Sequence, residues 1–448
     1  MGSDGGLVDA DRFSGLKSIL SGPAAGVVGY ALTSWDEKQK TPVIWLDTGG
    51  TSTDVSRVSG RYELDINTVA AGGGSCLSFR NGLFLAGPES AGADPGPTCY
   101  RKNGPLAVTD ANLLLGRLLP DYFPKIFGPS EKEPLDIDAS RAAFEKVVKE
   151  VNDSYGSAEG DANAKKEWSF DEVVYGFVKV ANETMCRPIR ALTEARGYAT
   201  GQHVLASFGG AGGQHACEIA KLLGIRTILI HRYSSVLSAY GLALADRAHE
   251  IQAPSSTFYT ANNKPELISR LDKLEAEVRE ELRKQGFEGT RVSVERMLNM
   301  RFEGTDTALM VFSESDEKAG EEGEDFLKAF RRTYKNEFGF LLEGKTIVVR
   351  GIGKTFDTLG ETVFSEMDRL RESDAIKPAA KEKMDSRHSV YFDQIGRVDD
   401  TPVYLLDKLE VGEQVHGPAI VIDDTQTIVV VPGAKAVLGR KHLVIELD

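Results

Sequence analysis

Two carboxylates flank a cluster of glycines and hydroxyls within residues 43–54. An apolar run of strand length ends at Asp47, and Asp54 follows the cluster. Two such carboxylates could hold a Mg²⁺ that keeps several of its waters, or they could position an attacking water. Between them stand residues whose backbone N–H groups and hydroxyls could bind phosphate: Gly49, Gly50, Thr51, Ser52 and Thr53. The spacing predicts a phosphate site in which Asp47 and Asp54 carry the catalytic and metal-binding roles.

The same residues also fit an ordinary β-hairpin. Thr-Gly-Gly-Thr favours a tight turn, and residues 55–58 could form the return strand. A hairpin can carry a phosphate site, so both interpretations stay open. Two commoner glycine motifs are absent, because no Gly-Lys-Ser/Thr follows the glycines and no G-x-G-x-x-G opens a helix. A P-loop and a dinucleotide-binding turn are therefore disfavoured.

A second glycine cluster occupies residues 209–213. Residues 204–208 predict a buried strand, and a helix should begin near Gln214 and continue through Leu223. Strand, glycine loop and helix in this order bring backbone N–H groups and the helix dipole to one point, which suits an anion or a flat ring. The candidate binding residues are Gly209, Gly210, Ala211, Gly212 and Gly213. A strand-to-helix turn without a ligand fits equally well.

The segments around these clusters predict an α/β fold. Ser169 and Glu172 form a capping box that opens a helix towards Arg196, with Gly197 ending it. An exposed loop is expected at residues 154–163, before this helix. A further strand at residues 227–230 and a small-residue segment at 234–245 continue the alternation of strands and helices.

Several other polar residues have ordinary explanations that we favour. Glu89 and Asp94 lie in a glycine- and proline-rich stretch, where solvated acids on a rigid surface loop are expected. Cys99 has few basic neighbours, which favours a buried, inert thiol. His215 stands alone at a helix start, where capping or packing is the commoner role.

Composition excludes several classes of partner. A chain of 448 residues should hold two or three domains, and its net charge of −14 disfavours nucleic acid and anionic membranes. No run of about 18 apolar residues occurs, so no membrane-spanning helix is expected. Four scattered cysteines suggest a reducing, cytoplasmic location: Cys76, Cys99, Cys186 and Cys217.

The pattern changes near residue 258, which predicts domains at residues 1–257 and 258–448. The second part should contain helices at 266–285 and 326–340, an acidic loop at 315–324, and short strands over the last 60 residues. Those strands suggest a small β-rich domain packed on the core or on a partner, and we assign no chemistry to them. Glu303 and Asp306 are expected to be structural.

Together these motifs resemble the hydantoinase A and 5-oxoprolinase family, within the actin-like ATPase superfamily. The resemblance covers essentially the whole chain and is carried by residues 20–29, 47–54, 67–75, 87–97, 108–112 and 208–215, with 301–306 and 417–427 nearer the C-terminus. Residues 185–190 and 353–358 favour the oxoprolinase branch. The fold this implies is an actin-like, ribonuclease H-like α/β core with a C-terminal α+β, β-rich domain.

The resemblance also implies a reaction. Enzymes of this type use ATP and Mg²⁺ to open the lactam of 5-oxo-L-proline, giving L-glutamate, ADP and phosphate in glutathione metabolism. Asp47 and Asp54 would serve the metal and the water, residues 49–53 would hold phosphate, and the loop at 209–213 would lie against adenosine. Phosphorylating the lactam oxygen would make an otherwise unreactive amide a better electrophile.

Two departures from the family pattern bear on partners. The chain has a single acid-Gly-Gly-Thr motif, whereas full-length members carry another in an N-terminal hydantoinase A domain, and nothing resembles the hydantoinase B-like part. We therefore expect a fragment of an enzyme that forms a homodimer when complete. A subunit of a hydantoinase-type amidohydrolase and an inactive structural or assembly fragment are the alternatives.

Overall fold

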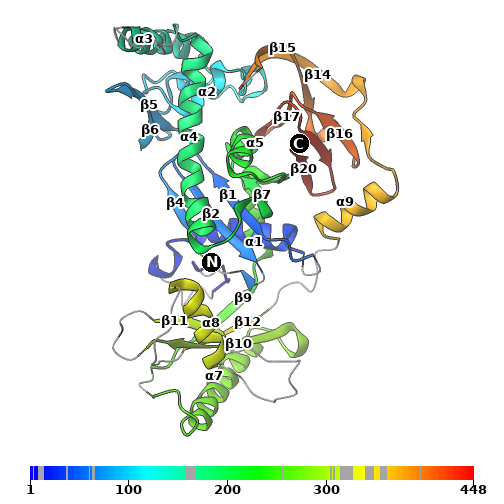
Figure 1. Ribbon diagram of the computed structural model, residues 1–448. Helices are drawn as coiled ribbons and strands as arrows, with labels where there is room; N and C mark the ends of the chain where they lie inside the picture. The colour runs from blue at the N-terminus through cyan, green and yellow to red at the C-terminus, as the bar shows by residue number, and fades with distance from the viewer. Residues whose placement is uncertain are drawn as a thin grey trace. The chain divides into compact units, whose positions relative to one another are not determined.

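The chain forms two compact units. Unit 1 comprises Met1–Val28 and Gly241–Leu359, and unit 2 comprises Gly29–Tyr240 and Gly360–Asp448. Helices α1 (Ser21–Ser34) and α6 (Leu237–Leu244) each contain a boundary between the units. The computed structural model (Figure 1) describes residues 1–3, 5–8, 15–36, 39–59, 61–62, 66–156, 167–254, 257–302, 305, 308–312, 326–338, 348–353, 361–393 and 395–448.

Unit 2 is built on a sheet of ten described strands. Its centre is β1 (Val43–Thr48), β7 (Val204–Phe208) and β8 (Thr227–His231), which run parallel, and these strands are apolar and almost wholly buried, as expected where both faces are covered. On one side follow β2 (Thr53–Ser59), β3 (Arg61–Tyr62) and β4 (Asn67–Val69). On the other side follow β20 (His442–Glu446), β19 (Lys435–Leu438), β16 (Glu413–His416) and β13 (Lys377–Pro378).

Helices of unit 2 pack on this sheet and on the elements beside it. The capping box of Ser169 and Glu172 opens α4 (Phe170–Leu192), as predicted. Helix α5 (Gly212–Leu223) follows β7 directly and shares one apolar core with the large sheet and with α4. A second core joins α4 to α2 (Val108–Leu114), α3 (Ile137–Gly156) and the hairpin of β5 (Ser75–Arg80) and β6 (Leu83–Ser90). The loop expected at 154–163 begins inside α3, and residues 157–166 lie outside the described part.

The C-terminal strands of unit 2 are divided between two sheets. A four-stranded sheet contains β14 (Met384–Phe392), β15 (Gly396–Leu405), β17 (Ala419–Asp423) and β18 (Gln426–Val430). The others, β16, β19 and β20, extend the large sheet, where β20 pairs antiparallel with β8. The C-terminal part of unit 2 therefore extends the sheet that carries β1 and β7 and also forms a separate sheet of its own.

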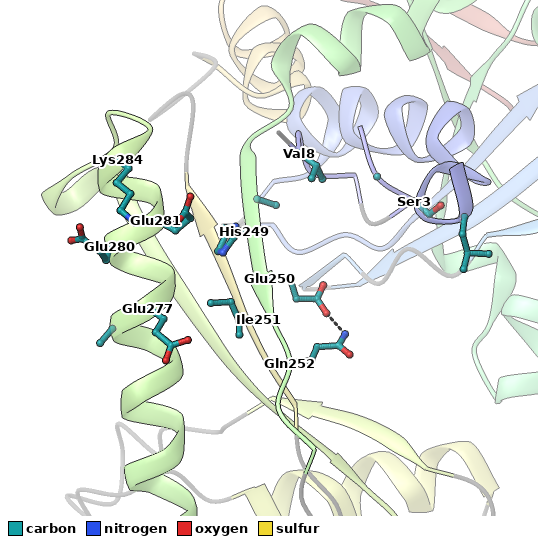
Figure 2. Close-up of a pocket in the computed structure, with 14 residues that line it drawn as sticks. Ser3, Val8, His249, Glu250, Ile251, Gln252, Glu277, Glu280, Glu281 and Lys284 are labelled. Atoms are coloured by element: carbon teal, nitrogen blue, oxygen red, sulfur yellow. Dashed lines mark hydrogen bonds and ion pairs between the residues drawn. The ribbon is translucent and has the colours of Figure 1, made fainter. Parts of the chain in front are cut away.

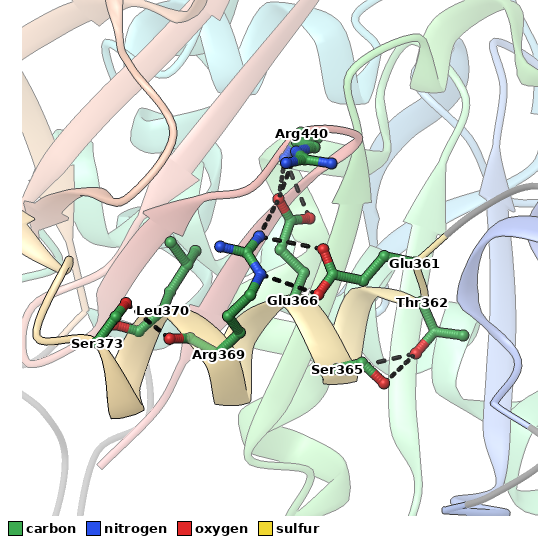
Figure 3. A network of polar contacts seen from close by, with 8 residues as sticks. All are labelled: Glu361, Thr362, Ser365, Glu366, Arg369, Leu370, Ser373 and Arg440. Carbon is green, nitrogen blue, oxygen red and sulfur yellow. Dashed lines mark hydrogen bonds and ion pairs between the residues drawn. The ribbon is translucent and has the colours of Figure 1, made fainter.

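Helix α9 (Val363–Glu372) is fastened to the turn between β19 and β20 (Figure 3). The Glu366 carboxylate is buried and accepts the backbone N–H of Arg440 at 3.0 Å, while Arg369 makes a two-pronged ion pair with Glu361. Thr362 caps the helix by accepting the N–H of Ser365. The contact between Glu366 and Arg440 joins α9 to this turn, while the other two contacts stabilise the N-terminal part of the helix.

Unit 1 is smaller. Its four-stranded sheet has the order β11 (Leu309–Phe312), β10 (Val292–Met300), β12 (Val348–Gly353) and β9 (Arg247–Ile251). Helices α7 (Lys264–Lys284) and α8 (Phe326–Phe338) confirm the two predicted helices as far as the description reaches, and both contribute to its core. The acidic loop at 315–324, Glu303, Asp306 and residues 354–358 lie outside the described residues. No helix in the described part is both long and apolar enough to cross a membrane.

Candidate functional site

The predicted β-hairpin is present, and it places the two carboxylates opposite each other. Asp47 and Asp54 are direct cross-strand partners in the β1–β2 pair. The turn is closed by the N–H of Gly49, which donates to the carbonyl oxygen of Ser52 at 3.0 Å. Thr51 is exposed and Ser52 is partly buried. The hairpin interpretation is thus confirmed, and the turn leaves room for the phosphate interpretation as well.

Asp47 lies in an unfavourable electrostatic environment for a carboxylate. Burial raises its pKa to about 7, and the charge of Asp54 adds to the shift. Asp54 accepts a hydrogen bond from the Thr68 hydroxyl at 2.5 Å, whereas no described residue donates a hydrogen bond to the Asp47 side chain. A cation beside this pair would relieve both effects.

A third glycine segment, Gly72–Gly74, packs on the hairpin turn. The N–H groups of Gly73 and Gly74 donate to the carbonyl oxygens of Gly49 and Gly50 at 3.1 and 2.6 Å. A Cβ on Gly72 would come within 2.7 Å of the Gly49 oxygen, so only glycine fits there. The buried Thr53 hydroxyl donates to the carbonyl oxygen of Ala71 at 2.6 Å, so this predicted phosphate ligand faces the neighbouring segment.

The loop at residues 209–213 lies against the end of β1. Gly209 has a φ of 80°, and a Cβ there would lie 2.4 Å from the Thr48 oxygen and 2.5 Å from Asp47 Oδ1. The N–H of Ala211 donates to the Thr48 oxygen at 3.2 Å. In contrast, a Cβ on Gly210 would meet nothing within 4 Å. The two glycine clusters that the sequence singled out therefore meet beside Asp47.

A pocket of about 330 Å³ opens where these segments converge. Four of the predicted residues line it, namely Gly49, Gly50, Gly210 and Ala211. The other predicted residues stand outside its lining: Asp47, Thr51, Ser52, Thr53, Asp54, Gly209, Gly212 and Gly213. The volume falls at the lower end of those found for small-molecule sites.

Sequence reasoning did not assign a ligand role to most of the lining. Gly73, Thr109 and Gln214 contribute backbone or polar side chains, and Tyr100, Leu118, Tyr122, Phe123 and Pro124 give an apolar wall. The remaining residues are 422–427, in the β17–β18 hairpin. The C-terminal strands, for which the sequence predicted no chemistry, contribute this turn to the lining of the pocket. A run of three glycines at 72–74 was the available signal for one missed segment.

A buried polar network is centred on His215, the residue that follows Gln214 of the pocket lining. His215 is fully buried, its Nδ1 is 2.6 Å from Asn182 Oδ1, and its Nε2 is 3.2 Å from Asn112 Nδ2. Asn182 donates to Glu218 at 2.7 Å, and Glu218 also accepts from the buried Arg117 at 2.6 Å. Burial lowers the pKa of His215 to about 3, and the charge of Arg117 acts in the same direction. These contacts give His215 the packing role expected for it.

The ordinary explanations of Cys99, Glu89 and Asp94 agree with the structure. Cys99 is buried, and burial raises the pKa of its thiol. Glu89 and Asp94 are exposed, and Lys102 Nζ lies 3.6 Å from Asp94 Oδ1. All four cysteines are free.

A larger pocket, of about 1150 Å³, lies in unit 1 between β9 and α7 (Figure 2). Its charged lining comes from Glu250, Glu277, Glu280, Glu281 and Lys284. It contains none of the residues predicted to bind phosphate or adenosine, so the smaller pocket of unit 2 remains the candidate site. No group of three or more histidine, cysteine or acidic side chains among the described residues could hold a metal ion.

Known protein families match almost the whole chain. The hydantoinase/oxoprolinase family matches residues 1–251, and its C-terminal domain matches residues 257–447. The 5-oxoprolinase of Dictyostelium discoideum is 46% identical over 97% of this chain and 35% of its own length, and 5-oxoprolinase 1 of Arabidopsis thaliana is 46% identical over 98% and 35%. The chain thus spans about a third of the length of the curated relatives it matches.

A solved structure shows the same fold. The crystal structure of the ATP-dependent caprolactamase from Pseudomonas jessenii superposes with a TM-score of 0.76 at 25% identity, over 99% of this chain and 64% of that chain. The predicted α/β fold class is confirmed by this likeness and by the large mixed sheet.

Proposed function

Because the chain belongs to the hydantoinase/oxoprolinase family, we propose that it is the nucleotide-binding part of an ATP-dependent 5-oxoprolinase. The enzyme would hydrolyse 5-oxo-L-proline to L-glutamate while cleaving ATP to ADP and phosphate, within cytoplasmic glutathione metabolism. The observation that carries the proposal is the convergence of residues 49–50 and 210–211 on one pocket beside Asp47. Relatives named 5-oxoprolinase match nearly the whole chain at 46% identity.

The two glycine segments would divide the nucleotide between them. The hairpin turn at Gly49–Ser52, with Thr51 and Ser52 exposed or partly exposed, would hold phosphate oxygens. The loop at Gly209–Gly213 would approach adenosine through Gly210 and Ala211, while Gly209, Gly212 and Gly213 let the backbone pack closely behind it. Thr53 would act indirectly, by fixing the hairpin against Ala71.

Asp47 and Asp54 would hold Mg²⁺, for which their environment is suitable. The two carboxylates are cross-strand neighbours, and Asp47 has a raised pKa and no hydrogen-bond donor among the described residues. Magnesium is commonly bound by one or two carboxylates together with phosphate oxygens and waters. When bound, the ion would neutralise charge on the transferring phosphoryl group.

The chemistry assigned to this chain is binding and positioning for phosphoryl transfer. A lactam carbonyl resists water, and transfer of the γ-phosphoryl group from ATP to its oxygen gives a better electrophile and releases ADP. Preorganised donors near the developing charge lower that barrier most effectively when water is excluded. Asp47, or Asp54, would orient the attacking water that leads to ring opening and phosphate release.

Domain organisation and partners complete the proposal. We propose family domains at residues 1–257 and 258–448, in line with the two family matches, whereas the compact units of the structure divide the chain differently. We expect the rest of the enzyme to supply an N-terminal hydantoinase A domain and a hydantoinase B-like part. The complete enzyme would be a homodimer. A hydantoinase-type amidohydrolase subunit and an assembly fragment without activity are the competing functions.

Calorimetric titration of the chain with ATP and Mg²⁺ tests the binding part of the proposal. In the complete enzyme, Asp47→Ala should abolish ATP cleavage that depends on 5-oxoproline and leave the circular dichroism spectrum unchanged. Asp400→Ala, at an exposed position of β15 outside the pocket, is the matched control. Wild-type turnover by the Asp47 variant would remove the assignment, and cleavage driven by a hydantoin instead of 5-oxoproline would favour the hydantoinase alternative.

A further inference from the structure

The turn between β17 and β18 forms a wall of the candidate nucleotide pocket. Residues 422–427 line the pocket together with Gly49 and Gly210, although they lie far from both in the sequence. Gln426 and Thr427 are buried, whereas Asp424 and Thr425 are exposed. The turn thus has an anchored side and a side open to a ligand.

The anchored side is tied to the predicted adenosine loop. Gly209 donates its N–H to the Ser234 carbonyl oxygen at 3.0 Å, and the Ser234 hydroxyl donates to Gln426 Oε1. The Gln426 amide nitrogen donates to the Arg232 carbonyl oxygen at 3.1 Å. A Cβ on Gly213 would lie 2.6 Å from the Thr427 oxygen, so α5 starts in direct contact with this strand. The turn is therefore fixed to the nucleoside side of the pocket.

The two acids of the turn have different surroundings. Asp423 Oδ1 accepts the N–H groups of Thr425 and Gln426 at 2.7 and 2.9 Å and the Thr425 hydroxyl at 2.8 Å, while Oδ2 accepts from the Gln426 amide at 2.7 Å. Its carboxylate is used in shaping the turn. Asp424 makes no hydrogen bond or ion pair with the described residues, and it lines the pocket. Its carboxylate is thus available to a ligand.

We propose that Asp424 accepts a hydrogen bond from the nucleoside part of the bound nucleotide, an inference that rests on the proposed function. A carboxylate repels phosphate, so it suits the end of the nucleotide that carries neutral donors. Those donors are the ribose hydroxyls and the amino group of adenine, and carboxylates bind ribose hydroxyls in other nucleotide sites. The apolar wall of Leu118, Phe123 and Pro124 gives the ring system a matching surface.

The test compares nucleotide binding by the chain and by Asp424→Ala in calorimetry with Mg²⁺. We expect the variant to bind ATP and adenosine about tenfold more weakly or worse, because a hydrogen bond to a charged group is lost, and to bind inorganic triphosphate unchanged. Wild type should also prefer ATP over one of three analogues: 2′-deoxy-ATP, 3′-deoxy-ATP or inosine triphosphate. The variant should lose that preference, and the analogue concerned identifies the donor.

Asp400→Ala serves as the control, since this acid is exposed on β15 and outside the pocket. Unchanged ATP affinity in Asp424→Ala, or tighter binding through relief of repulsion with phosphate, would overturn the inference while leaving the proposed function intact. Failure of the wild-type chain to bind any nucleotide would instead remove the proposed function, and the role of Asp424 with it.

Discussion

Burial and the charge of Asp54 both act against ionisation of Asp47, and this makes stability depend on pH. The folded chain holds the Asp47 proton up to a pKa of about 7, from an ordinary value of 3.8. Between these values the folded state binds more protons than the unfolded state, so stability falls as pH rises through that window. A neutral side chain at position 47 would not lose stability in this way as the pH rises.

Asp47→Asn should therefore stabilise the chain at pH 8 relative to wild type by about 1–2 kcal/mol, after allowing for solvent screening, and should change it less at pH 5. Urea unfolding at both pH values measures the difference. Asp400→Asn, an exposed acid, should show no such dependence. An equal change in the free energy of unfolding at pH 5 and pH 8 would mean that the surroundings do not raise the pKa of the Asp47 carboxyl group.

Gly209 and Gly210 are neighbours with opposite constraints, which makes them a matched pair. Gly209→Ala should destabilise the chain by about 2 kcal/mol or more, because its φ of 80° and contacts of 2.4–2.5 Å leave no room for a Cβ. Gly210→Val should leave the melting temperature nearly unchanged but weaken nucleotide binding, since its side chain would enter the pocket. Normal ATP binding by Gly210→Val would mean that the loop is only a structural turn.

Residue types and spacing allowed part of this site to be predicted. Strand ends and glycines, which are local features, singled out residues 47–54 and 209–213, and the family resemblance implied that both segments serve one nucleotide. The hydrogen-bond partner of each side chain could not be predicted from these features. Thr53 looked like a free donor, yet its alternating position in β2 turns the hydroxyl inward to Ala71. Which face of a strand is buried depends on the sheet beside it.

At the scale of elements, one histidine joins three helices. Because Asn182 donates to Glu218, its oxygen faces Nδ1 of His215, and that nitrogen must carry the proton. Nε2 is then free to accept from Asn112. The ion pair between Arg117 and Glu218 thus sets the orientation of the whole chain of contacts across α2, α4 and α5.

His215→Ala should destabilise the chain by about 2–4 kcal/mol, because it leaves a cavity and removes the partners of Asn182 Oδ1 and Asn112 Nδ2. Chemical denaturation measures the loss, and His416→Ala, at an exposed position, is the control. Since the pKa of His215 is lowered to about 3, burying it neutral costs stability as pH falls below 6.5. The variant should accordingly be less sensitive to acid than wild type over that range, and an identical slope would contradict the network.

Elements with strong local signals were predicted closely, and long-range pairings were not. The capping box of α4 and the strand at Val204–Phe208 appear at their predicted starts, because a cap and an apolar run are local. The alternation of apolar and polar residues over 389–446 predicted strands but not the strands with which they pair. Whether β20 pairs with β8 or joins the sheet of β17 depends on tertiary packing. The position of the β17–β18 turn at the pocket depends on tertiary packing in the same way, and it could not be predicted from the sequence.

At the scale of the whole molecule, we propose that the chain supplies one set of walls for the nucleotide. It spans about 35% of the length of the 5-oxoprolinase relatives it matches, and Asp424, Thr425 and Gly50 at the pocket are exposed. Fixed donors stabilise a transferring phosphoryl group most effectively in a site from which water is excluded. An exposed pocket can bind a nucleotide but cannot protect the reaction.

We therefore expect the 448 residues alone to bind ATP weakly and to show no ATP hydrolysis that depends on 5-oxo-L-proline. Phosphate and glutamate release, measured with and without the lactam, test this, with the full-length Dictyostelium discoideum 5-oxoprolinase as the positive control. Adding the N-terminal hydantoinase A domain should tighten nucleotide binding, because phosphate would then be held from both sides. Glutamate release by the isolated chain at a rate near that of the control would show that one set of walls suffices, and the division of labour proposed for this family member would be wrong.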